Sequence, residues 1–428
     1  MLKTQFKGRI IEVGREIREN QDIHWIELFS ESVSRVFILP PEIAAQGLSP
    51  QNLSQGQLVT VSTDSQDRVV SIETLGTAPT YWDPLSDVLR WRRPLGKKSR
   101  MSKLRQRQEI LSAIRTFLYD LDYLEVETPL LVKGTCPDSH IESIPAGSTS
   151  TDTEGYLVTS TEYQIKRLMV GGFEKVFTLT KNFRANDRGR FHASEFTMIE
   201  WARAYGDLGE IEKDAEGFIK KAFAILYPRH TFLEFQGECI DLMQSPWERI
   251  TVRQAFEKYL RMTDLKNFSG ETLLKSAGRA GIQVPENFVS DPHLTLSYLL
   301  DQLQPHLGRK TPTFLREWPA FMTSSGQVNS SDPTVADRSE LYICGIEIAD
   351  GFPFLTNAEL QKQFFQRELE RRKNHGQSKV TTDERYLDAL KQGIPPGAGM
   401  ALGIDRLVLV LTQSDALAEV QAFSWDET

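Results

Sequence analysis

Two arginines stand at positions where the sequence offers chemistry on phosphate groups. Arg184 lies within FTLTKNFRANDRGRFHASEFTMIEW (residues 177–201), and Arg406 lies within GMALGIDRLVLVL (residues 399–411). A planar guanidinium contacts phosphate oxygens through two parallel hydrogen bonds, which suits phosphate better than an ammonium group does. The two segments therefore indicate a site in which fixed cations meet the negative charge of a reacting nucleotide.

Other common catalytic patterns are absent from the sequence. There is no GxxxxGK[ST] loop, and Gly397, Gly399 and Gly403 are spaced GxGxxxG rather than GxGxxG, so neither a P-loop nor a dinucleotide fold is indicated. The sequence also lacks HExxH, GxSxG and a recognisable Cys–His pairing. Metal hydrolase and serine hydrolase activities are therefore not favoured.

Length and composition favour two unequal domains of a globular protein. The chain has 428 residues, 40% of them hydrophobic and 25% charged, which is enough to bury a sizeable core. Its net charge of −8 does not favour a strongly electrostatic nucleic-acid binder. The three cysteines never show CxxC spacing, and neither an apolar signal segment nor a run of 18 apolar residues is present. We expect a protein of the reducing cytoplasm, without a membrane span.

Residues 1–80 are expected to form a small all-β, OB-like barrel. Five short strands separated by turn residues predict this fold, and a generic β-module or an SH3-like barrel is the alternative. Up to residue 76 there are 7 Lys and Arg against 10 Asp and Glu. This net negative charge does not favour the binding of RNA phosphates by the domain. Trp25 and Phe37 either stack on bases or pack within the sheet.

A basic segment separates this domain from a larger one. Residues 81–101 form the expected linker, and the basic run that starts there is either solvated or a contact for a nucleic acid or an acidic partner. Residues 102–428 form the expected large domain, which opens with a helix whose apolar residues share one face. These are Ile110, Leu111, Ile114, Phe117, Leu118 and Leu121. Extended and helical segments then alternate, and a mostly helical insertion is expected between Arg203 and Glu340. The pattern predicts an α+β fold.

Three segments resemble the motifs of class II aminoacyl-tRNA synthetases. DYLEVETPLL (residues 122–131) resembles motif 1, residues 177–201 resemble motif 2, and residues 399–411 resemble motif 3. STEYQIKR (residues 160–167) and ELYICGIEIADGF (residues 340–352) lie between them, in an order that chance hardly explains. The sequence of these segments most resembles the lysyl/aspartyl/asparaginyl branch of the class. Within that branch it is similar to the paralogues that attach a lysine-type residue to elongation factor P, with an added barrel as in lysyl-tRNA synthetase.

The resemblance implies an antiparallel sheet flanked by helices, and a role for each matching residue. Arg184 and Arg406 would be the catalytic cations. Together with them, the expected ATP-binding residues are Asn186, His192, Phe196, Glu347, Ile348 and Gly403. Mg²⁺ is expected on Glu340 and Glu347. The expected amino-acid-binding residues are Ser160, Glu162, Glu200, Ala202, Asp350 and Phe354. In the family, Glu162 matches the residue that takes the α-amino group, and Glu200 matches one that faces a lysine ammonium.

The amino-acid side departs from the family pattern. The family has Tyr where this chain has Ala202, Glu where it has Phe354, Asn where it has Asp350 and Glu where it has Asn186. A buried ammonium needs paired carboxylates or several acceptors, so a lysine side chain would be poorly held. Two accounts remain open: the pocket accepts a different amino acid, or Asp350 and Glu200 form a new acidic pair.

The expected reaction has two steps. An amino acid and Mg·ATP give an aminoacyl-adenylate and pyrophosphate, and an acceptor nucleophile then attacks the mixed anhydride. Likeness to the elongation factor P enzymes favours a protein lysine as the acceptor, whereas the barrel favours tRNA. The motif 1 resemblance implies a homodimer. The rival interpretation is a non-catalytic paralogue that binds ATP, an amino acid or a partner, and the altered residues are its main support.

Overall fold

Two compact units make up the chain. The computed structural model describes residues 4–18, 21–30, 33–41, 43, 53–76, 94–95, 98–148, 153–323 and 326–428. The units are Met1–Arg105 and Gln106–Thr428, and the boundary falls within helix α2 (Arg100–Asp120). Residues 81–93 of the predicted linker lie outside the described residues, so the linker and the predicted domain limits stay predictions. None of the described helices is long and apolar enough to cross a membrane.

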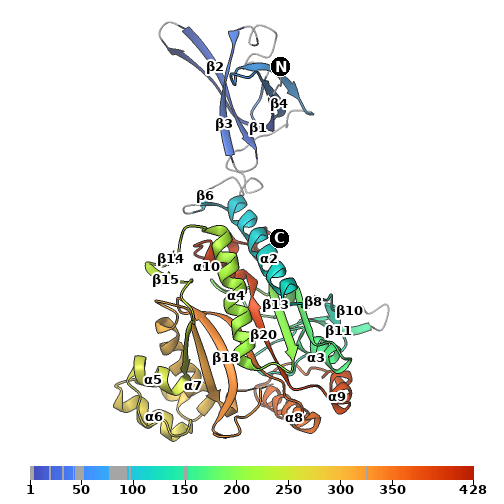
Figure 1. The fold of residues 1–428 in the computed structure, drawn as a ribbon, viewed down its shortest axis with the longest axis vertical. Coiled ribbons are helices and arrows are strands. Elements are labelled where there is room, and N and C mark those ends of the chain that lie inside the picture. Colours follow the sequence, from blue (N-terminus) through green and yellow to red (C-terminus); the bar gives the residue numbers. More distant parts are fainter. Residues whose placement is uncertain are drawn as a thin grey trace. The chain divides into compact units, whose positions relative to one another are not determined.

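The N-terminal unit is one five-stranded antiparallel sheet in the order β3-β2-β1-β4-β5 (Figure 1). Its strands are β1 (Thr4–Arg18), β2 (Gln21–Ser30), β3 (Val33–Leu39), β4 (Leu58–Thr63) and β5 (Val69–Thr74). The long strand β1 pairs with β4 through its first half and with β2 through its second half, with an irregularity between Ile10 and Glu12. The edge strands β3 and β5 also contact each other, as they do in a sheet that curls towards a barrel.

The alternation of buried and exposed side chains along β3 distinguishes the two roles considered for Phe37. Phe37 is 5% exposed and belongs to the core of this unit, whereas Val36 and Ile38 on either side are 58% and 63% exposed. The stacking role for Phe37 is therefore wrong. The Trp25 ring packs against Gly14 of β1, because a Cβ atom added at Gly14 would come within 2.2 Å of the ring.

The second unit is built on an eight-stranded sheet in the order β16-β17-β18-β19-β20-β13-β12-β8. Its strands are β8 (Leu124–Glu125), β12 (Lys175–Phe183), β13 (Glu195–Ala204), β16 (Glu248–Thr251), β17 (Thr313–Pro319), β18 (Val335–Ile343), β19 (Ile346–Pro353) and β20 (Gly397–Gly403). All neighbouring pairs are antiparallel except the outermost pair at each edge. The α+β prediction, with helices around an antiparallel sheet, is confirmed.

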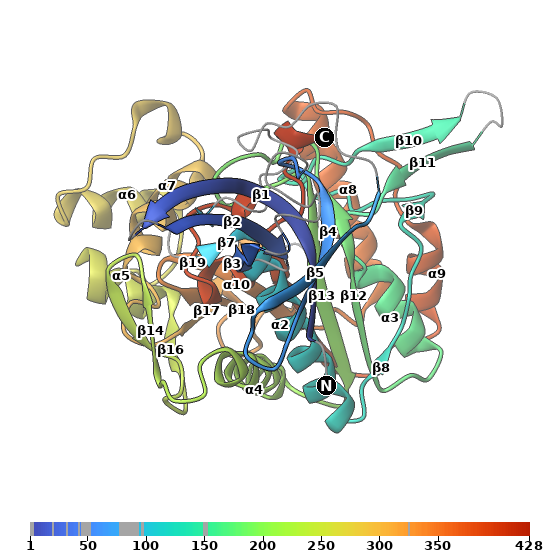
Figure 2. The ribbon, with the colours of Figure 1, turned by 90° about the horizontal axis from the view of Figure 1, so that it is seen from above.

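Helices cover both faces of this sheet. One face packs against α2, α4 (Leu208–Leu226) and α10 (Ile404–Leu411) in the largest core cluster. The other face packs against α3 (Glu162–Val170), α8 (Ala358–Asn374) and α9 (Glu384–Lys391). Figures 1 and 2 show α5 (Val252–Leu260), α6 (Gly270–Arg279) and α7 (Pro292–Leu303) as a separate group on the opposite side of this unit from α3 and α9.

Several smaller strands complete the second unit: β9 (Leu131–Val132), β10 (Pro145–Ser148), β11 (Thr153–Leu157), β14 (Phe232–Phe235) and β15 (Glu238–Asp241). Strands β6 (Pro94–Leu95) and β7 (Lys98–Ser99) precede α2 and belong to the first unit. Strands β10 and β11 form a hairpin that projects from the body of the unit (Figure 2).

The segment 340–352 forms the two strands β18 and β19, because Cys344 and Gly345 turn the chain with φ of 51° and 74°. The insertion between Arg203 and Glu340 is not only helical, since it supplies β16 and β17 to the main sheet. Strand β16 has the sequence ERIT and strand β17 the sequence TFLREWP, and periodicity alone does not separate such short runs from helix.

A buried carboxylate connects helix α2 with the segments that resemble motif 2 and motif 3. Asp405, at the start of α10, is 3% exposed and accepts a hydrogen bond from the Thr197 backbone N–H on β13 at 2.6 Å. The Arg107 guanidinium on α2 donates to Asp405 at 2.7 Å and to the Thr197 hydroxyl at 2.8 Å. The positions of α2, β13 and α10 are therefore fixed by one closed network.

Replacing Asp405 by Asn tests this network. The neutral amide keeps the shape but leaves the Arg107 charge without its carboxylate, so we expect the free energy of unfolding to fall by about 3 kcal/mol. Urea unfolding of the full chain measures it. The control is Arg279→Ala, which removes an exposed ion pair of similar length (2.9 Å to Asp264) and should cost less than about 0.5 kcal/mol. Equal losses in the two variants would contradict the proposed role.

Candidate active site

One row of residues across the sheet forms the floor of a cavity. Across β12, β13, β20, β19 and β18 the residues in register are Thr178, Glu200, Ala401, Asp350 and Glu340. Opposite residues of antiparallel strands point to the same face, so the three carboxylates share it. On β20 the neighbouring positions on this face are Gly399 and Gly403, and these small residues leave the space above the strand open.

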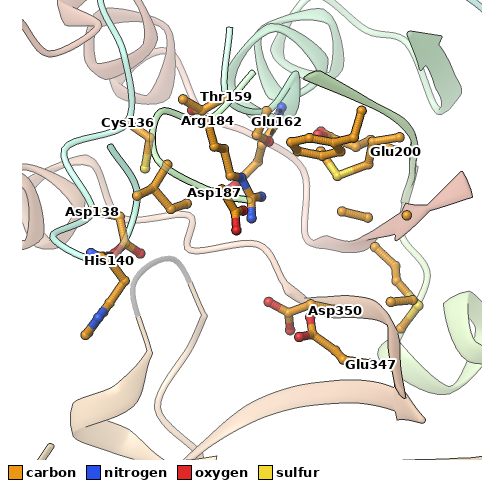
Figure 3. Close-up of a pocket in the computed structure, with 18 of the residues that line it drawn as sticks. Cys136, Asp138, His140, Thr159, Glu162, Arg184, Asp187, Glu200, Glu347 and Asp350 are labelled. Atoms are coloured by element: carbon orange, nitrogen blue, oxygen red, sulfur yellow. Dashed lines mark hydrogen bonds between the residues drawn. The ribbon is translucent and has the colours of Figure 1, made fainter. Parts of the chain in front are cut away.

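All residues predicted to bind ATP, metal or amino acid line this one cavity of about 830 Å³. They are Ser160, Glu162, Arg184, Asn186, His192, Phe196, Glu200, Ala202, Glu340, Glu347, Ile348, Asp350, Phe354, Gly403 and Arg406. In Figure 3, Arg184 and Glu162 point into the cavity from one side, and Asp350 and Glu347 lie on the other. The structure thus brings together segments that are far apart in the sequence, while the role of each residue stays a prediction.

Arg184 follows the last residue of β12. Its backbone N–H donates to Ser194 across the motif 2 hairpin at 2.9 Å, and its guanidinium carbon lies 5.1 Å from the centre of the Phe196 ring. The Arg184 Nε atom is buried and has no hydrogen-bond partner in the part of the chain that the structure describes. A buried donor without an acceptor is costly, so this atom fits a ligand oxygen.

Arg406 lines the same cavity as Arg184. Its guanidinium donates to the backbone carbonyls of Phe191 at 3.1 Å and Glu347 at 2.9 Å, and its Nη2 lies 2.7 Å from Nε2 of His192. Burial and the Arg406 charge lower the pKa of His192, so the imidazole is neutral near pH 7 and accepts this bond through Nε2. Motif 2 and motif 3 meet at this contact.

The motif 2 turn and the start of α10 leave room for a ligand. Asn186 has a φ of 60°, a left-handed conformation that asparagine tolerates better than glutamate does. A Cβ atom added at Gly403 would meet only the Arg406 side chain, at 3.8 Å or more. Gly403 therefore borders open space and is not required by crowding within the chain.

Arg338 pairs with Asp350 and Glu340, the two carboxylates at one end of this row of residues. It donates two hydrogen bonds to Asp350, at 2.9 and 3.1 Å, and one to Glu340 at 2.6 Å. Burial raises the pKa of both carboxyls, and the Arg338 charge acts in the opposite direction. The Tyr342 hydroxyl also donates to Glu340. Asp350 is thus bound to Arg338 rather than to Glu200, from which the Ala401 position separates it.

Glu200 lies on β13 and is 4% exposed. One of its oxygens accepts the Thr161 backbone N–H at 2.9 Å, and the other accepts the Thr161 hydroxyl at 3.0 Å. Burial raises the pKa of Glu200 to about 7, despite these hydrogen bonds to Thr161 and one from Ser160. Glu200 is therefore poised between its charged and neutral forms at neutral pH.

Glu162 begins helix α3 and pairs with Lys166 one turn later. The Lys166 Nζ atom lies 2.6 Å from a Glu162 oxygen, and the Lys166 side chain is 2% exposed. Burial lowers the pKa of Lys166, but Glu162 and Tyr386 outweigh burial and hold the pKa above its ordinary value. A charged ammonium group of the protein itself thus lies in the wall of the cavity.

Phe354 closes the floor beyond the last residue of β19. It is 2% exposed, and its backbone N–H donates to Gly397 at 2.8 Å. A Cβ atom added at Gly397 would lie 2.8 Å from the Phe354 ring, and one added at Gly399 would lie 3.4 Å from both the ring and the Ala202 side chain. The ring therefore fills the space beside Ala202, where a larger residue would not fit.

The predicted metal ligands differ in accessibility. The Glu347 side chain is 37% exposed, whereas Glu340 is 4% exposed and already bound to Arg338. Within the described ranges, no group of three or more His, Cys, Asp or Glu side chains is arranged to hold a metal ion. Mg²⁺ on a nucleotide often takes only one or two carboxylates, because phosphate oxygens and water complete its shell. The donor set therefore fits a metal that arrives with phosphates.

Two residues that shape the cavity were not predicted, although the sequence contained a signal for each. Arg338 lies two residues before Glu340 on a strand, which places both on one face. Lys166 lies four residues after Glu162 on a helix, the spacing of a Glu–Lys ion pair. By contrast, neither spacing nor residue type revealed that Phe354 would pack beside Ala202.

Comparison with known proteins gives a consistent result. Residues 89–427 match the family described as tRNA synthetases class II (D, K and N). The chain is 34% identical over 332 residues to elongation factor P--(R)-beta-lysine ligase of Salmonella arizonae, covering 76% of this chain and 95% of that protein. It is 34% identical over 328 residues to the ligase of the same name from Salmonella dublin and 33% identical to that from Salmonella paratyphi B, with the same coverage.

The raised pKa of Glu200 predicts that burial of this side chain lowers the stability of the fold by an amount that depends on pH. Between the ordinary value of 4.5 and the folded value of about 7, the folded state binds more protons than the unfolded state does. Stability from this group therefore falls as pH rises through that window. We expect Glu200→Gln to raise the melting temperature relative to the parent protein more at about pH 8 than at about pH 5. A melting-temperature difference that does not change with pH would contradict the assignment.

Proposed function

The chain belongs to the class II tRNA synthetase family of the D, K and N branch, a family of ligases, and we propose that it activates an amino acid with ATP. In the proposed first step, a carboxylate oxygen of the amino acid attacks the α-phosphorus of ATP, and the bond to the leaving pyrophosphate breaks. In the second step, an acceptor nucleophile attacks the carbonyl carbon of the aminoacyl-adenylate, and AMP leaves.

The observation that carries this proposal is the pair of arginines at one end of the cavity. The first step adds negative charge around the α-phosphorus, and preorganised cations stabilise such a transition state. Arg184 offers a buried Nε donor without a partner among the described residues, next to the aromatic face of Phe196. No side-chain nucleophile is needed, because the substrate carboxylate is itself the nucleophile. The chain's contribution is alignment and charge neutralisation.

We assign the nucleotide to the space between motifs 2 and 3. Phe196 and Arg406 would lie on opposite faces of the adenine ring, with Ile348 and Gly403 beside it, and Asn186 and His192 would contact the nucleotide from the motif 2 turn. Glu347, with Glu340 behind it, would hold Mg²⁺, which neutralises phosphate charge when bound. The neutral state of His192 fits a hydrogen bond rather than an ion pair with phosphate.

We place the amino acid at the other end of the cavity. Glu162, next to Ser160, would take the α-ammonium group, and Glu200, Ala202, Asp350 and Phe354 would surround the side chain. In this proposal the pocket is altered relative to the family pattern, because Phe354 fills the space beside Ala202 and Arg338 forms hydrogen bonds with Asp350.

Elongation factor P is the acceptor that we propose, because the relatives that the chain resembles are named as its ligases. An uncharged lysine amine of that protein would attack the mixed anhydride. The five-stranded N-terminal sheet favours tRNA as a second candidate, since OB-like sheets bind nucleic acids. Incubating the protein with radiolabelled amino acid, ATP and each acceptor in turn distinguishes the two.

Replacing Arg184 by Ala tests the enzymatic proposal. Loss of this cation should lower amino-acid-dependent ATP–pyrophosphate exchange by about 100-fold to 1,000-fold. The control is Arg188→Ala in the same turn, since Arg188 lies over the Trp425 ring and does not line the cavity, and it should retain most of the rate. A non-catalytic paralogue would show no exchange in the parent protein, and that result would refute the proposal.

A homodimer is part of the proposal. Strand β8 is a sheet edge that pairs only with β12 among the described strands, and an unpaired edge is a ready site for association. Around it lie exposed apolar side chains: Tyr119 (50%), Leu124 (50%) and Phe173 (40%). A surface of this kind, within the segment that resembles motif 1, favours self-association.

Leu124→Asp tests the dimer. A charge at this edge should move the mass measured by analytical ultracentrifugation from twice the chain mass of 48.7 kDa towards that mass itself. Leu360→Asp is the control, because Leu360 is equally exposed (49%) but lies on α8, and it should leave the mass unchanged. A parent protein that is monomeric at micromolar concentration would contradict the proposal.

A further inference from the structure

We infer that the amino-acid end of the cavity takes an amino acid with an uncharged side chain, and that Lys166 and Phe354 exclude cationic ones. The inference deepens the proposed function and rests on it. It names a substrate class that differs from the lysine-type residue in the names of the relatives.

The first argument is the state of the carboxylates. A cationic side chain enclosed in protein needs acceptors that are not already neutralised. Asp350 and Glu340 share Arg338, and Glu162 is paired with Lys166 at 2.6 Å. The chain's own cations thus already occupy three of the acidic groups in this part of the cavity. A substrate cation would have to compete with an arginine and a lysine that are fixed in place.

Glu200 does not alter this conclusion. Both of its oxygens accept hydrogen bonds from Thr161. Burial, and also repulsion from Glu162, raise its pKa, so the two carboxylates lie near each other. The α-ammonium group that every amino acid carries would be attracted to both. Among Glu162, Glu200, Glu340 and Asp350, that leaves no carboxylate that is both fully charged and unpaired for a second ammonium group on the side chain.

The second argument is the shape and charge of the floor. The Phe354 ring covers Gly397 and Gly399 beside Ala202, so this surface is apolar. The Lys166 Nζ atom lies 5.6 Å from the centre of the Phe354 ring and 5.4 Å from that of Phe352, so the protein already supplies the cation that these ring faces attract. A substrate ammonium at this place would meet an aromatic ring and a like charge.

The test is ATP–pyrophosphate exchange by the full-length protein with two groups of amino acids. The cationic group is lysine, (R)-β-lysine, ornithine and arginine, and the uncharged group is the remaining neutral standard amino acids. We expect at least one uncharged amino acid to support exchange about tenfold faster than every cationic one. Lysine or (R)-β-lysine as the best substrate would overturn the inference and leave the proposed function standing.

Two substitutions of Phe354 test whether this residue determines the substrate preference. Phe354→Glu places a carboxylate next to Lys166 and should raise the rate ratio of cationic to uncharged substrates by about tenfold or more, whereas Phe354→Leu should keep the parent preference. An unchanged ratio in a folded Phe354→Glu protein would overturn the role of Phe354. If this variant does not fold, the substrate panel of the parent protein decides the inference.

Melting temperatures separate this inference from the function on which it rests. A non-hydrolysable sulfamoyl analogue of the preferred uncharged aminoacyl-adenylate should raise the melting temperature more than the lysyl analogue does. A larger rise with the lysyl analogue would overturn the inference alone. No exchange with either group, and no rise with ATP or either analogue, would refute the proposed function and the inference together.

Discussion

The candidate active site depends on the burial of one carboxylate, Asp405. A buried carboxylate must be paired, and this one takes its partners from two other segments: a guanidinium on α2 and a backbone N–H on β13. The next residue is Arg406, whose own hydrogen bonds reach the motif 2 turn and β19. Because β13 is also the partner of the strand that leads into Arg184, the network sets the relative position of the two arginines. Segments that lie more than 200 residues apart in sequence are held in one geometry.

The same requirement of charge compensation shapes the rest of the cavity. Its acidic groups lie on neighbouring strands, where their mutual repulsion and burial would be costly without cations. Arg338 and Lys166 supply those cations from within the chain. The result is a site with two ends. At the proposed nucleotide end, the Arg184 Nε donor has no partner among the described residues, whereas at the proposed amino-acid end the charges are already balanced and the floor is aromatic. The division fits a reaction that joins a highly charged nucleotide to a smaller molecule.

The residues that the sequence singled out line one cavity, because each belongs to a short segment with a recognisable pattern. Arg184, Arg406 and Glu347 are marked by the residues immediately around them. What the sequence did not predict depends on contacts between distant segments. Whether Asp350 would pair with Glu200 or with another group was decided by Arg338, and the packing of Phe354 beside Ala202 required the register of three strands. The role of Phe37 stayed open for a related reason, since only the curvature of the N-terminal sheet shows which face is enclosed.

The central claim is that the cavity between motifs 2 and 3 is an ATP site in which Arg184 acts on the reacting phosphate. A crystal structure of the full-length protein with Mg·ATP tests this most directly. We expect a phosphate oxygen within hydrogen-bonding distance of the Arg184 guanidinium, in the acceptor position opposite its buried Nε, and the adenine ring between Phe196 and Arg406. A nucleotide bound elsewhere, or bound here with Arg184 still without a phosphate contact, would contradict it.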